Sequence, residues 1–242
     1  MAGHVTHRDA ATGAQDVADG VTTIETIGDE RTGHLSQRIR RIAPGSSLEG
    51  LVTHGSEEIL YVTSGHGTLE LAGASFTLEP DVGIHLAAGE SYTLRAPEEA
   101  QLEVVSVLAP IPADSDVPLG ERQVTVRLAD QPSHPAGKDR EFRFVVTPDS
   151  GCRGVTQFVG WIPPGRARDH YHFYDEVVYI LEGTGVLHRE GEPDVAICQG
   201  SCIHFPARMV HCVENVGDSR LRVLGVFHPP GSAAAAYHPD DE

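Results

Sequence analysis

The chain has 242 residues, with 18 lysine and arginine residues against 35 aspartate and glutamate residues, so its formal net charge is −17. This length allows one or two domains with a sizeable buried core. The acidic balance argues against a protein that follows the phosphate backbone of nucleic acid, and against binding to anionic membrane surfaces. We therefore expect neither nucleic acid nor a membrane among its partners.

Targeting signals and cysteine spacing indicate the compartment. No apolar stretch approaches the roughly 20 residues of a spanning helix, and the N-terminus lacks the apolar region of an export signal. The four cysteines, at positions 152, 198, 202 and 212, do not have the paired CxxC spacing of a structural zinc site. We expect a cytoplasmic protein with reduced, mostly buried cysteines.

The elements predicted along the chain are short strands. The 26 glycines and 16 prolines interrupt runs rich in β-branched and alternating apolar residues, whereas no segment has a convincing helical period. The fold class is therefore predicted to be all-β. The clearest strand-like runs cover residues 57–65, 67–73, 100–110, 176–183 and 221–229.

An internal repeat organises these runs. EEILYVTSGHGTL aligns with DEVVYILEGTGVL at a constant offset, which pairs Glu58 with Glu176 and Gly65 with Gly183. A proline-rich segment joins the two copies, and each copy is long enough for a small barrel or double-sheet sandwich. We predict an N-terminal extension over 1–34, a first barrel over 35–115, a second over 116–230 and a C-terminal tail over 231–242. Neither chain end is expected to take part in chemistry.

The second copy contains a cluster of residue types that bind metals. On a strand, residues two apart point the same way, so His170, His172 and Glu176 are expected to share one face. His211 follows a glycine-rich turn and can lie on a neighbouring strand. Three imidazole nitrogens and a carboxylate suit iron, manganese, cobalt, nickel or zinc, and they leave coordination positions open.

The segments 165–183 and 200–215 resemble the paired motifs of the cupin superfamily, G-x5-HxH-x3/4-E-x6-G and G-x5-P-x-G-x2-H-x3-N. There are two departures: the first glycine-to-histidine gap is one residue short, and Ala207-Arg208 stands where the second motif has x-Gly. Neither departure is at a ligand position. The resemblance implies a bicupin of two double-stranded β-helix (jelly-roll) barrels, with His170, His172, Glu176 and His211 as metal ligands. It also leads us to expect a homodimer, because cupin barrels often pair through edge strands.

The first copy has lost most of these residues. With Glu58 aligned to Glu176, the HxH positions fall on Val52 and His54, and the second-motif histidine falls on or near Leu94. We expect a structural or dimer-forming barrel, or a lid, in which His54 and Glu58 can hydrogen-bond to each other. A metal there would need a third ligand such as His85 or His66 in a different geometry.

The pocket around the second-copy motif can be outlined only from strand spacing. We assign catalytic roles to Glu176 and to Tyr174, which lies between two ligands and could donate a proton. The residues expected to bind substrate are Arg168, Gln157, Trp161, Phe205 and Ile203, with Arg208 as a second candidate cation.

Within the superfamily, such a site suits three kinds of activity. An intact ligand set beside a degenerate one favours an enzyme acting on a small, anionic organic substrate, and we favour O2-dependent dioxygenase chemistry. The alternatives are redox-neutral isomerase, lyase or aminohydrolase chemistry, with the metal as Lewis acid, and non-catalytic binding of a small molecule. We expect one divalent transition metal per chain, with iron, manganese or nickel ahead of zinc or cobalt.

Overall fold

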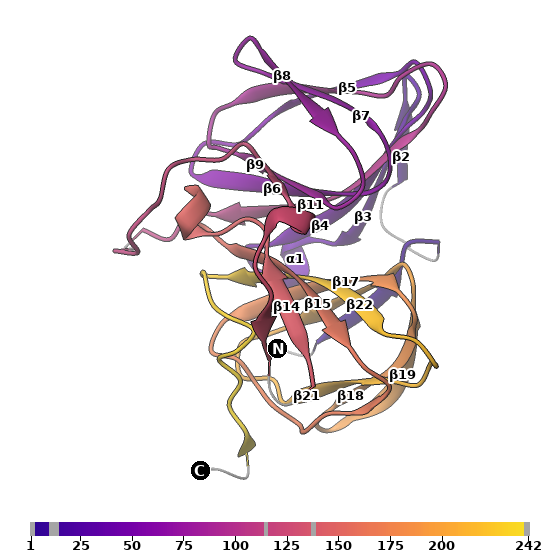
Figure 1. Ribbon diagram of the computed structural model, residues 1–242, viewed down its shortest axis with the longest axis vertical. Coiled ribbons are helices and arrows are strands. Elements are labelled where there is room, and N and C mark those ends of the chain that lie inside the picture. The colour runs from indigo at the N-terminus through magenta and orange to yellow at the C-terminus, as the bar shows by residue number, and fades with distance from the viewer. Residues whose placement is uncertain (1–2, 10–14, 114–115, 137–138, 240–242) are drawn as a thin grey trace.

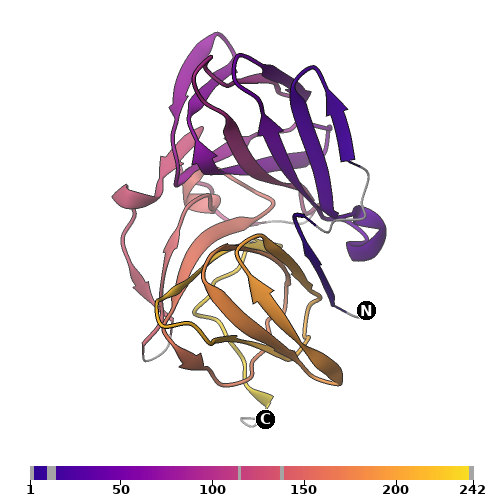
Figure 2. The ribbon, with the colours of Figure 1, turned by 90° about the vertical axis from the view of Figure 1, so that its right-hand side faces the viewer.

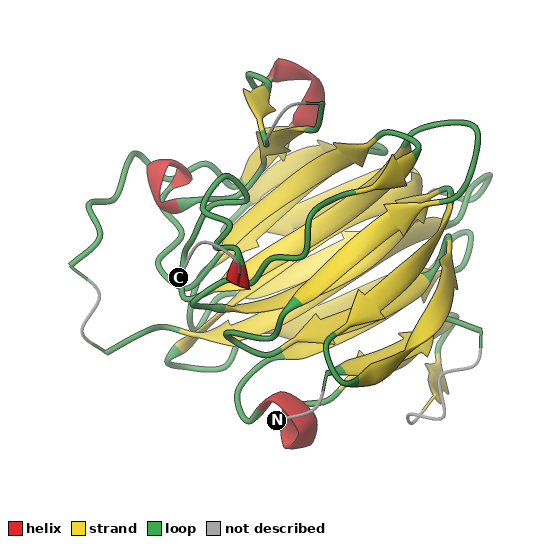
Figure 3. Ribbon diagram, turned by 90° about the horizontal axis from the view of Figure 1, so that it is seen from below, coloured by secondary structure: helices red, strands yellow, loops and turns green. Residues whose placement is uncertain are grey.

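The computed structural model describes residues 3–9, 15–113, 116–136 and 139–239, which form two stacked barrels (Figure 1). Each barrel is a seven-stranded antiparallel sheet facing a four-stranded one. Strands dominate the molecule, and helices are limited to short turns (Figure 3). The prediction of an all-β chain built from two jelly-roll barrels is confirmed.

The first barrel comes mainly from the first half of the chain. Its larger sheet has the order β12-β9-β6-β11-β4-β3-β2, and its smaller sheet has the order β5-β10-β7-β8. The bounds are β2 (Gln15–Ala18), β3 (Val21–Ile27), β4 (Ser36–Ile42), β5 (Ser47–Leu51), β6 (Ser56–Gly65), β7 (Gly67–Leu71), β8 (Ala74–Leu78), β9 (Val82–Leu86), β10 (Ser91–Arg95), β11 (Leu102–Pro110) and β12 (Thr125–Arg127).

The second barrel repeats this arrangement strand for strand. Its sheets have the orders β1-β20-β17-β22-β15-β14-β13 and β16-β21-β18-β19. The bounds are β1 (His4–His7), β13 (His134–Pro135), β14 (Glu141–Phe144), β15 (Thr156–Ile162), β16 (Gly165–Arg166), β17 (Asp175–Glu182), β18 (Thr184–Arg189), β19 (Glu192–Cys198), β20 (Ser201–Phe205), β21 (His211–Asn215) and β22 (Leu221–His228).

The remaining elements are short: helix α1 (Asp29–Thr32) and the 3-10 turns η1 (Leu128–Asp130) and η2 (Pro148–Ser150). Within the part of the chain that the structure describes, no helix has the length and apolar character needed to cross a membrane. All four cysteines are free, and only Cys198 is exposed.

The repeated glycines mark the same turn in both barrels. Gly65 and Gly183 have φ of 76° and 93°, a region that side chains with a Cβ rarely adopt. A Cβ on Gly65 would also lie 1.7 Å from the Gln101 carbonyl oxygen. This turn therefore requires glycine, which explains why the repeat is so clear at these positions.

The two barrels exchange their outermost strands. β1 pairs antiparallel with β20 in the second barrel, although it lies at the start of the chain (Figure 2). In the opposite direction β12, which follows the proline-rich segment, pairs with β9 of the first barrel. Strands β2 and β3, within the predicted N-terminal extension, belong to the first barrel's larger sheet. Each barrel is thus completed by a strand from the other half of the chain.

A shared core lies between the barrels. On β6, Leu60 and Val62 pack inside the first barrel, whereas Ile59 and Tyr61 pack against the second. Because both faces of the strand are buried, its sequence is almost continuously apolar instead of alternating. The larger sheets therefore form the contact between the barrels.

Candidate metal centre

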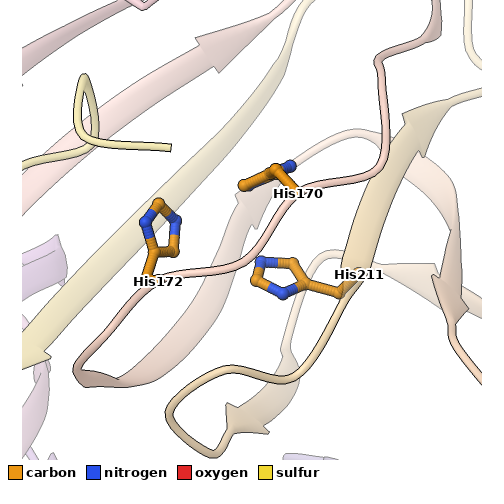
Figure 4. Close-up of side chains that lie close together, drawn as sticks. All are labelled: His170, His172 and His211. Atoms are coloured by element: carbon orange, nitrogen blue, oxygen red, sulfur yellow. The ribbon is translucent and has the colours of Figure 1, made fainter. Parts of the chain in front are cut away.

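Three histidines converge inside the second barrel (Figure 4). His170 and His172 lie in the segment between β16 and β17, and His211 begins β21. His170 and His211 exchange two backbone hydrogen bonds, of 3.0 and 2.8 Å, which hold the two segments in register. One ring nitrogen from each of the three lies within 4.8 Å of the others.

Backbone carbonyls orient all three rings. Each Nδ1 atom lies at hydrogen-bond distance from a carbonyl oxygen, so each Nδ1 carries the proton and donates it. Each Nε2 is then left with a lone pair, which is the tautomer of an imidazole that ligates a metal. The carbonyls belong to Arg168, Ala235 and Met209, at 3.3, 3.0 and 2.8 Å from His170, His172 and His211, respectively.

Glu176 completes the cluster. Its Oε2 atom is 3.7 Å from His211 Nε2 and 3.9 Å from His172 Nε2, and the side chain is buried. Among the described residues no hydrogen bond reaches this carboxylate, and burial raises its pKa to about 8. A buried carboxylate without donors is costly unless a cation accompanies it.

The electrostatics of the imidazoles agree with this arrangement. Burial, together with the neighbouring His172, lowers the pKa of His170 to about 4, and burial and His170 lower the pKa of His211 well below its usual value. The rings are therefore neutral at physiological pH, as metal ligands must be. Three neutral nitrogens and one carboxylate oxygen fit a divalent transition metal that has positions left for other ligands.

A cavity of about 450 Å³ opens from the cluster. Its wall is mainly apolar and aromatic, with two guanidinium groups, those of Arg140 and Arg168. The apolar and aromatic lining residues include Phe142, Phe158, Ile162, Val178, Phe205, Val213, Val223 and Phe227. This volume is typical of small-molecule sites in proteins.

The structure brings some of the predicted substrate residues to this cavity. Arg168, Trp161 and Phe205 line it, and the Phe205 ring stacks on His211 with 3.9 Å between centroids. Ile203 instead is fully buried in the barrel core. Arg208 is not in the wall, since its guanidinium lies over the Phe173 ring.

Gln157 does not reach the cavity either. Its side chain points to the first barrel, where an added Cβ on Gly83 would lie 2.9 Å from Gln157 Oε1. On β15 the inward face that lines the cavity carries Phe158, Gly160 and Ile162, whereas of the residues expected there only Trp161, near the end of the strand, reaches the cavity. A displacement of one residue exchanges the two faces of a strand.

Tyr174 lies beside the cluster without pointing its hydroxyl at it. The ring stacks on His172, with centroids 5.2 Å apart. The hydroxyl donates to the Ser232 carbonyl oxygen and accepts from the Ser232 N–H. Tyr174 thus fixes the C-terminal segment in place, and its role as a proton donor remains a prediction.

The C-terminal segment forms part of the site, contrary to the expectation that neither chain end takes part. Ala233, Ala234, Ala236 and His238 line the cavity, and His238 Nδ1 lies 2.9 Å from the Asp169 carbonyl oxygen. The segment also supplies the carbonyl that orients His172. Arg140 was missed as well, because it lies outside both motifs and an isolated arginine gave no signal.

The first barrel has a cation of its own at the equivalent place. Arg40 Nη1 is 2.7 Å from Glu58 Oε1, and the Tyr92 hydroxyl donates to Glu58 Oε2 over 2.9 Å. Arg40 also donates to the Tyr92 hydroxyl at 2.6 Å. The guanidinium therefore compensates the buried carboxylate, and among the described residues no histidine joins Glu58.

Strand pairing corrects the alignment of the two copies. The register places Tyr92 at the position of His211, and Gly50 at that of His170. Leu94, the expected counterpart, is a core residue. A constant offset failed because Gly50 lies 8 positions before Glu58 whereas His170 lies 6 before Glu176, and Tyr92 lies 34 positions after Glu58 whereas His211 lies 35 after Glu176.

The expected contact between His54 and Glu58 is wrong. His54 lies exposed in the loop after β5, whereas Glu58 is buried with Arg40 and Tyr92. His66 is also exposed, and its nearest carboxylate is that of Glu99, at 3.9 Å. Neither histidine is in a position to replace a lost ligand.

A second group of metal-binding residue types lies between the barrels: Glu57, His85 and Cys152. Glu57 Oε1 is 3.1 Å from His85 Nε2, and Oε2 accepts from the Cys152 thiol and from the N–H groups of Arg153 and Gly154. Burial and the nearby Glu57 charge raise the pKa of the thiol, so it stays protonated as a donor. The carboxylate is satisfied without a metal.

The opposite side of the contact between the barrels repeats this arrangement. Asp175 lies 3.2 Å from both His204 Nε2 and His34 Nε2. Glu57 directly precedes Glu58 and contacts Cys152 of the second half of the chain. Asp175 directly precedes Glu176 and contacts His34 of the first half. These two clusters, Glu57–His85–Cys152 and Asp175–His204–His34, join the barrels.

Comparison with known proteins agrees with this architecture. The cupin domain family matches residues 38–108 and 159–227, which together make up more than half of the chain. The chain belongs to the cupin family. An uncharacterized protein of Methanocaldococcus jannaschii is 34% identical over 64 residues, which cover 26% of this cupin and 50% of the relative. The cupin thus matches only half the length of that relative.

Solved structures of oxalate decarboxylase share the fold. A variant of the Bacillus subtilis protein superposes with a TM-score of 0.77 at 16% identity, over 98% of this cupin and 79% of that chain. Another structure of the same protein, described with Mn(II) centres, gives a TM-score of 0.76 over the same shares. The likeness shows that the cupin is a bicupin in architecture.

Proposed function

We propose that this cupin is a metal-dependent enzyme that acts on a small organic anion in its second barrel. The observation that carries the proposal is the set of three imidazoles, all in the ligand tautomer, that meet a buried carboxylate without hydrogen-bond donors at one end of a 450 Å³ cavity. We assign one divalent metal per chain to His170, His172, Glu176 and His211. Iron, manganese or nickel is favoured, and the Mn(II) centres of oxalate decarboxylase support manganese.

The residues of the chain would divide the work as follows. The four ligands would hold a metal able to act as Lewis acid and, if redox-active, to exchange electrons. Phe205, stacked on His211, fixes the orientation of that ring. The apolar wall excludes water, which strengthens electrostatic interactions with a bound substrate. Arg140 and Arg168 provide positive charge for an anion.

Two reaction classes fit this site. We favour O2-dependent dioxygenase chemistry, because four protein ligands leave positions on the metal for both a substrate and O2. The second candidate is a redox-neutral reaction such as decarboxylation, and the structural likeness to oxalate decarboxylase supports it. Both reaction classes need the same metal ligands, so the oxygen dependence of turnover distinguishes them.

The proposal is tested by metal analysis followed by turnover assays. Protein purified without chelators is expected to hold about one metal per chain, and His172→Ala is expected to lose it. His54→Ala is the matched control, because His54 is exposed in the other barrel. Failure to bind iron, manganese, nickel, cobalt or zinc would overturn the proposal.

Turnover is then followed with a panel of small carboxylic acids in air and under argon. Oxygen uptake coupled to substrate loss would support the dioxygenase. Equal turnover under argon would move the assignment to redox-neutral chemistry. A ligand that binds the metal-loaded protein but is never converted would indicate a binding protein.

A further inference from the structure

We propose that the cavity selects a monocarboxylate with an apolar, ring-sized body, whose carboxylate pairs with Arg140 while the body lies along an aromatic wall leading to the metal ligands. This inference deepens the proposed function and rests on it for the reacting end of the substrate.

Arg140 is a half-buried cation at the open edge between the two sheets of the second barrel. It precedes β14 in the larger sheet, and its Nη2 atom donates to the Val213 carbonyl oxygen of β21 in the smaller sheet, over 3.1 Å. Burial lowers the pKa of Arg140, but a guanidinium remains charged at neutral pH. Among the described residues no carboxylate lies within ion-pair distance of it. A partly desolvated guanidinium with unused donors is suited to bind a carboxylate.

The neighbouring acidic groups do not neutralise Arg140. Glu141 lines the cavity but pairs with Arg220 and accepts from Ser133. Asp139 is exposed beside Arg140 and affects it only through space. Arg168, the other cation of the wall, is exposed and therefore more strongly screened by water. Arg140 is thus the cation of the wall that distinguishes most strongly between an anion and a neutral ligand.

An aromatic wall connects Arg140 to the metal ligands. Phe142, two residues after Arg140, contacts Phe158 edge-on with 6.0 Å between centroids. Phe158 stacks on Phe227 at 4.8 Å, and Phe227 in turn lies 5.1 Å from the His172 ring. All three phenylalanines line the cavity. A ligand held at Arg140 would therefore extend over apolar surface before it reaches the cluster.

The size of the cavity supports an apolar body over a small diacid. A benzene molecule fits a cavity of about 150 Å³, which is well below the 450 Å³ available here. An ion the size of oxalate would leave most of the aromatic wall without contacts. The wall also offers no second buried cation for a second carboxylate, among the described residues.

Calorimetric titration of the metal-loaded protein with simple probes tests this inference. The probes are benzoate, phenylacetate and 3-phenylpropanoate, their neutral amides, and acetate and oxalate. At least one aromatic acid is expected to bind tenfold or more tightly than its amide, and tenfold or more tightly than acetate or oxalate. Equal binding of acid and amide would overturn the carboxylate assignment, and tighter binding of oxalate would overturn the apolar body.

Substitutions at and near Arg140 identify the residue that gives the preference for acid over amide. Arg140→Gln is expected to weaken binding of the acid at least tenfold while leaving binding of the amide unchanged, which a general loss of folding could not do. Arg143→Gln is the matched control three residues further along, within β14, because its guanidinium lies over Trp161 and donates to the Leu128 and Ala129 carbonyls. Asp139→Asn is expected to tighten acid binding a few-fold by removing a negative charge beside Arg140. An unchanged preference for acid over amide in Arg140→Gln would contradict the role of Arg140.

Failure of this inference is distinguishable from failure of the proposed function. Metal content is measured for each variant, and the titrations are repeated on metal-free protein. Because Arg140 and the phenylalanines are not ligands, the difference between acid and amide should persist without metal. If the protein binds metal but binds acid and amide equally, the inference alone is overturned. If the protein cannot bind any of the metals but still prefers acid to amide, only the proposed function is overturned.

Discussion

The two barrels bury a glutamate at the same point of equivalent strands but balance its charge differently. In the second barrel Glu176 faces three imidazoles and an open cavity. In the first, Arg40 occupies the corresponding space and pairs with Glu58. The register places Gly160 at the position of Arg40, and Gly160 lines the cavity of the second barrel. A copy that lacks the ligand set has thus kept its carboxylate by pairing it with a cation from its own chain.

Removal of a ligand should give the largest difference between the barrels. His211→Phe is expected to reduce metal from about one per chain to less than a tenth, because it removes a nitrogen donor and adds bulk. Tyr92→Phe introduces the same side chain at the equivalent position of the first barrel and should leave the metal content unchanged. Elemental analysis of both variants measures this. Loss of metal in Tyr92→Phe would show that the first barrel contributes a site.

We expect Arg40, the cation of the first barrel, to contribute to the free energy of unfolding. Arg40→Met leaves Glu58 buried and uncompensated, and breaking such a pair costs about 3–5 kcal/mol. Arg38→Met removes a more exposed pair with Glu25 and should cost less than about 1 kcal/mol. Urea unfolding of both variants measures the free energies. Adding Glu58→Gln to Arg40→Met should recover part of the loss, and equal losses for the two arginines would contradict the comparison.

The C-terminal segment sharpens the comparison, because it is a part of the site that only the second barrel has. A chain ending at Gly231 lacks the Ala235 carbonyl that orients His172. Loss of such a partner weakens metal binding about 10–100-fold. A chain ending at Ala236 keeps that carbonyl and should lose less metal affinity. Competition with a chelator measures both affinities, and equal affinities would contradict the positioning role of Ala235.

The smallest expected effect concerns the clusters between the barrels. Burial alone would raise the pKa of Glu57, but the hydrogen bond and charge of His85 and the Gly154 N–H outweigh it, so the pKa is lowered. A lowered folded-state pKa contributes stability above the ordinary value of 4.5 that is lost as the pH falls through the folded value. Glu57→Gln should therefore cost about 1 kcal/mol at pH 7.

The pH dependence distinguishes this effect from a simple packing defect. The difference in unfolding free energy between wild type and Glu57→Gln should narrow as the pH is lowered below 4.5 and through the folded-state pKa of Glu57. Denaturant unfolding across that range measures it. A constant difference would contradict the assignment of the charge to Glu57.

The strand pattern, the internal repeat and the resemblance to the paired cupin motifs were enough to predict the fold and the residues that meet in the second barrel. Contacts between distant segments were not predictable, because no local pattern indicates that Ala235 reaches His172 or that Arg40 reaches Glu58. Gln157 and Ile203 were misplaced for another reason. The face of a strand depends on the parity of its register, and β15 and β20 are buried on both sides, so their sequences do not reveal which side is inward.

The exchange of β1 and β12 has a consequence for any attempt to divide the molecule. A chain cut in the proline-rich segment would give two fragments, each carrying the outermost strand of its partner's sheet. Each would expose the unpaired edge of β9 or β20, a surface that readily recruits another strand. We expect the separated halves to be poorly soluble alone and to reassemble when mixed, as in fragment complementation. We therefore expect the two barrels to fold as one unit.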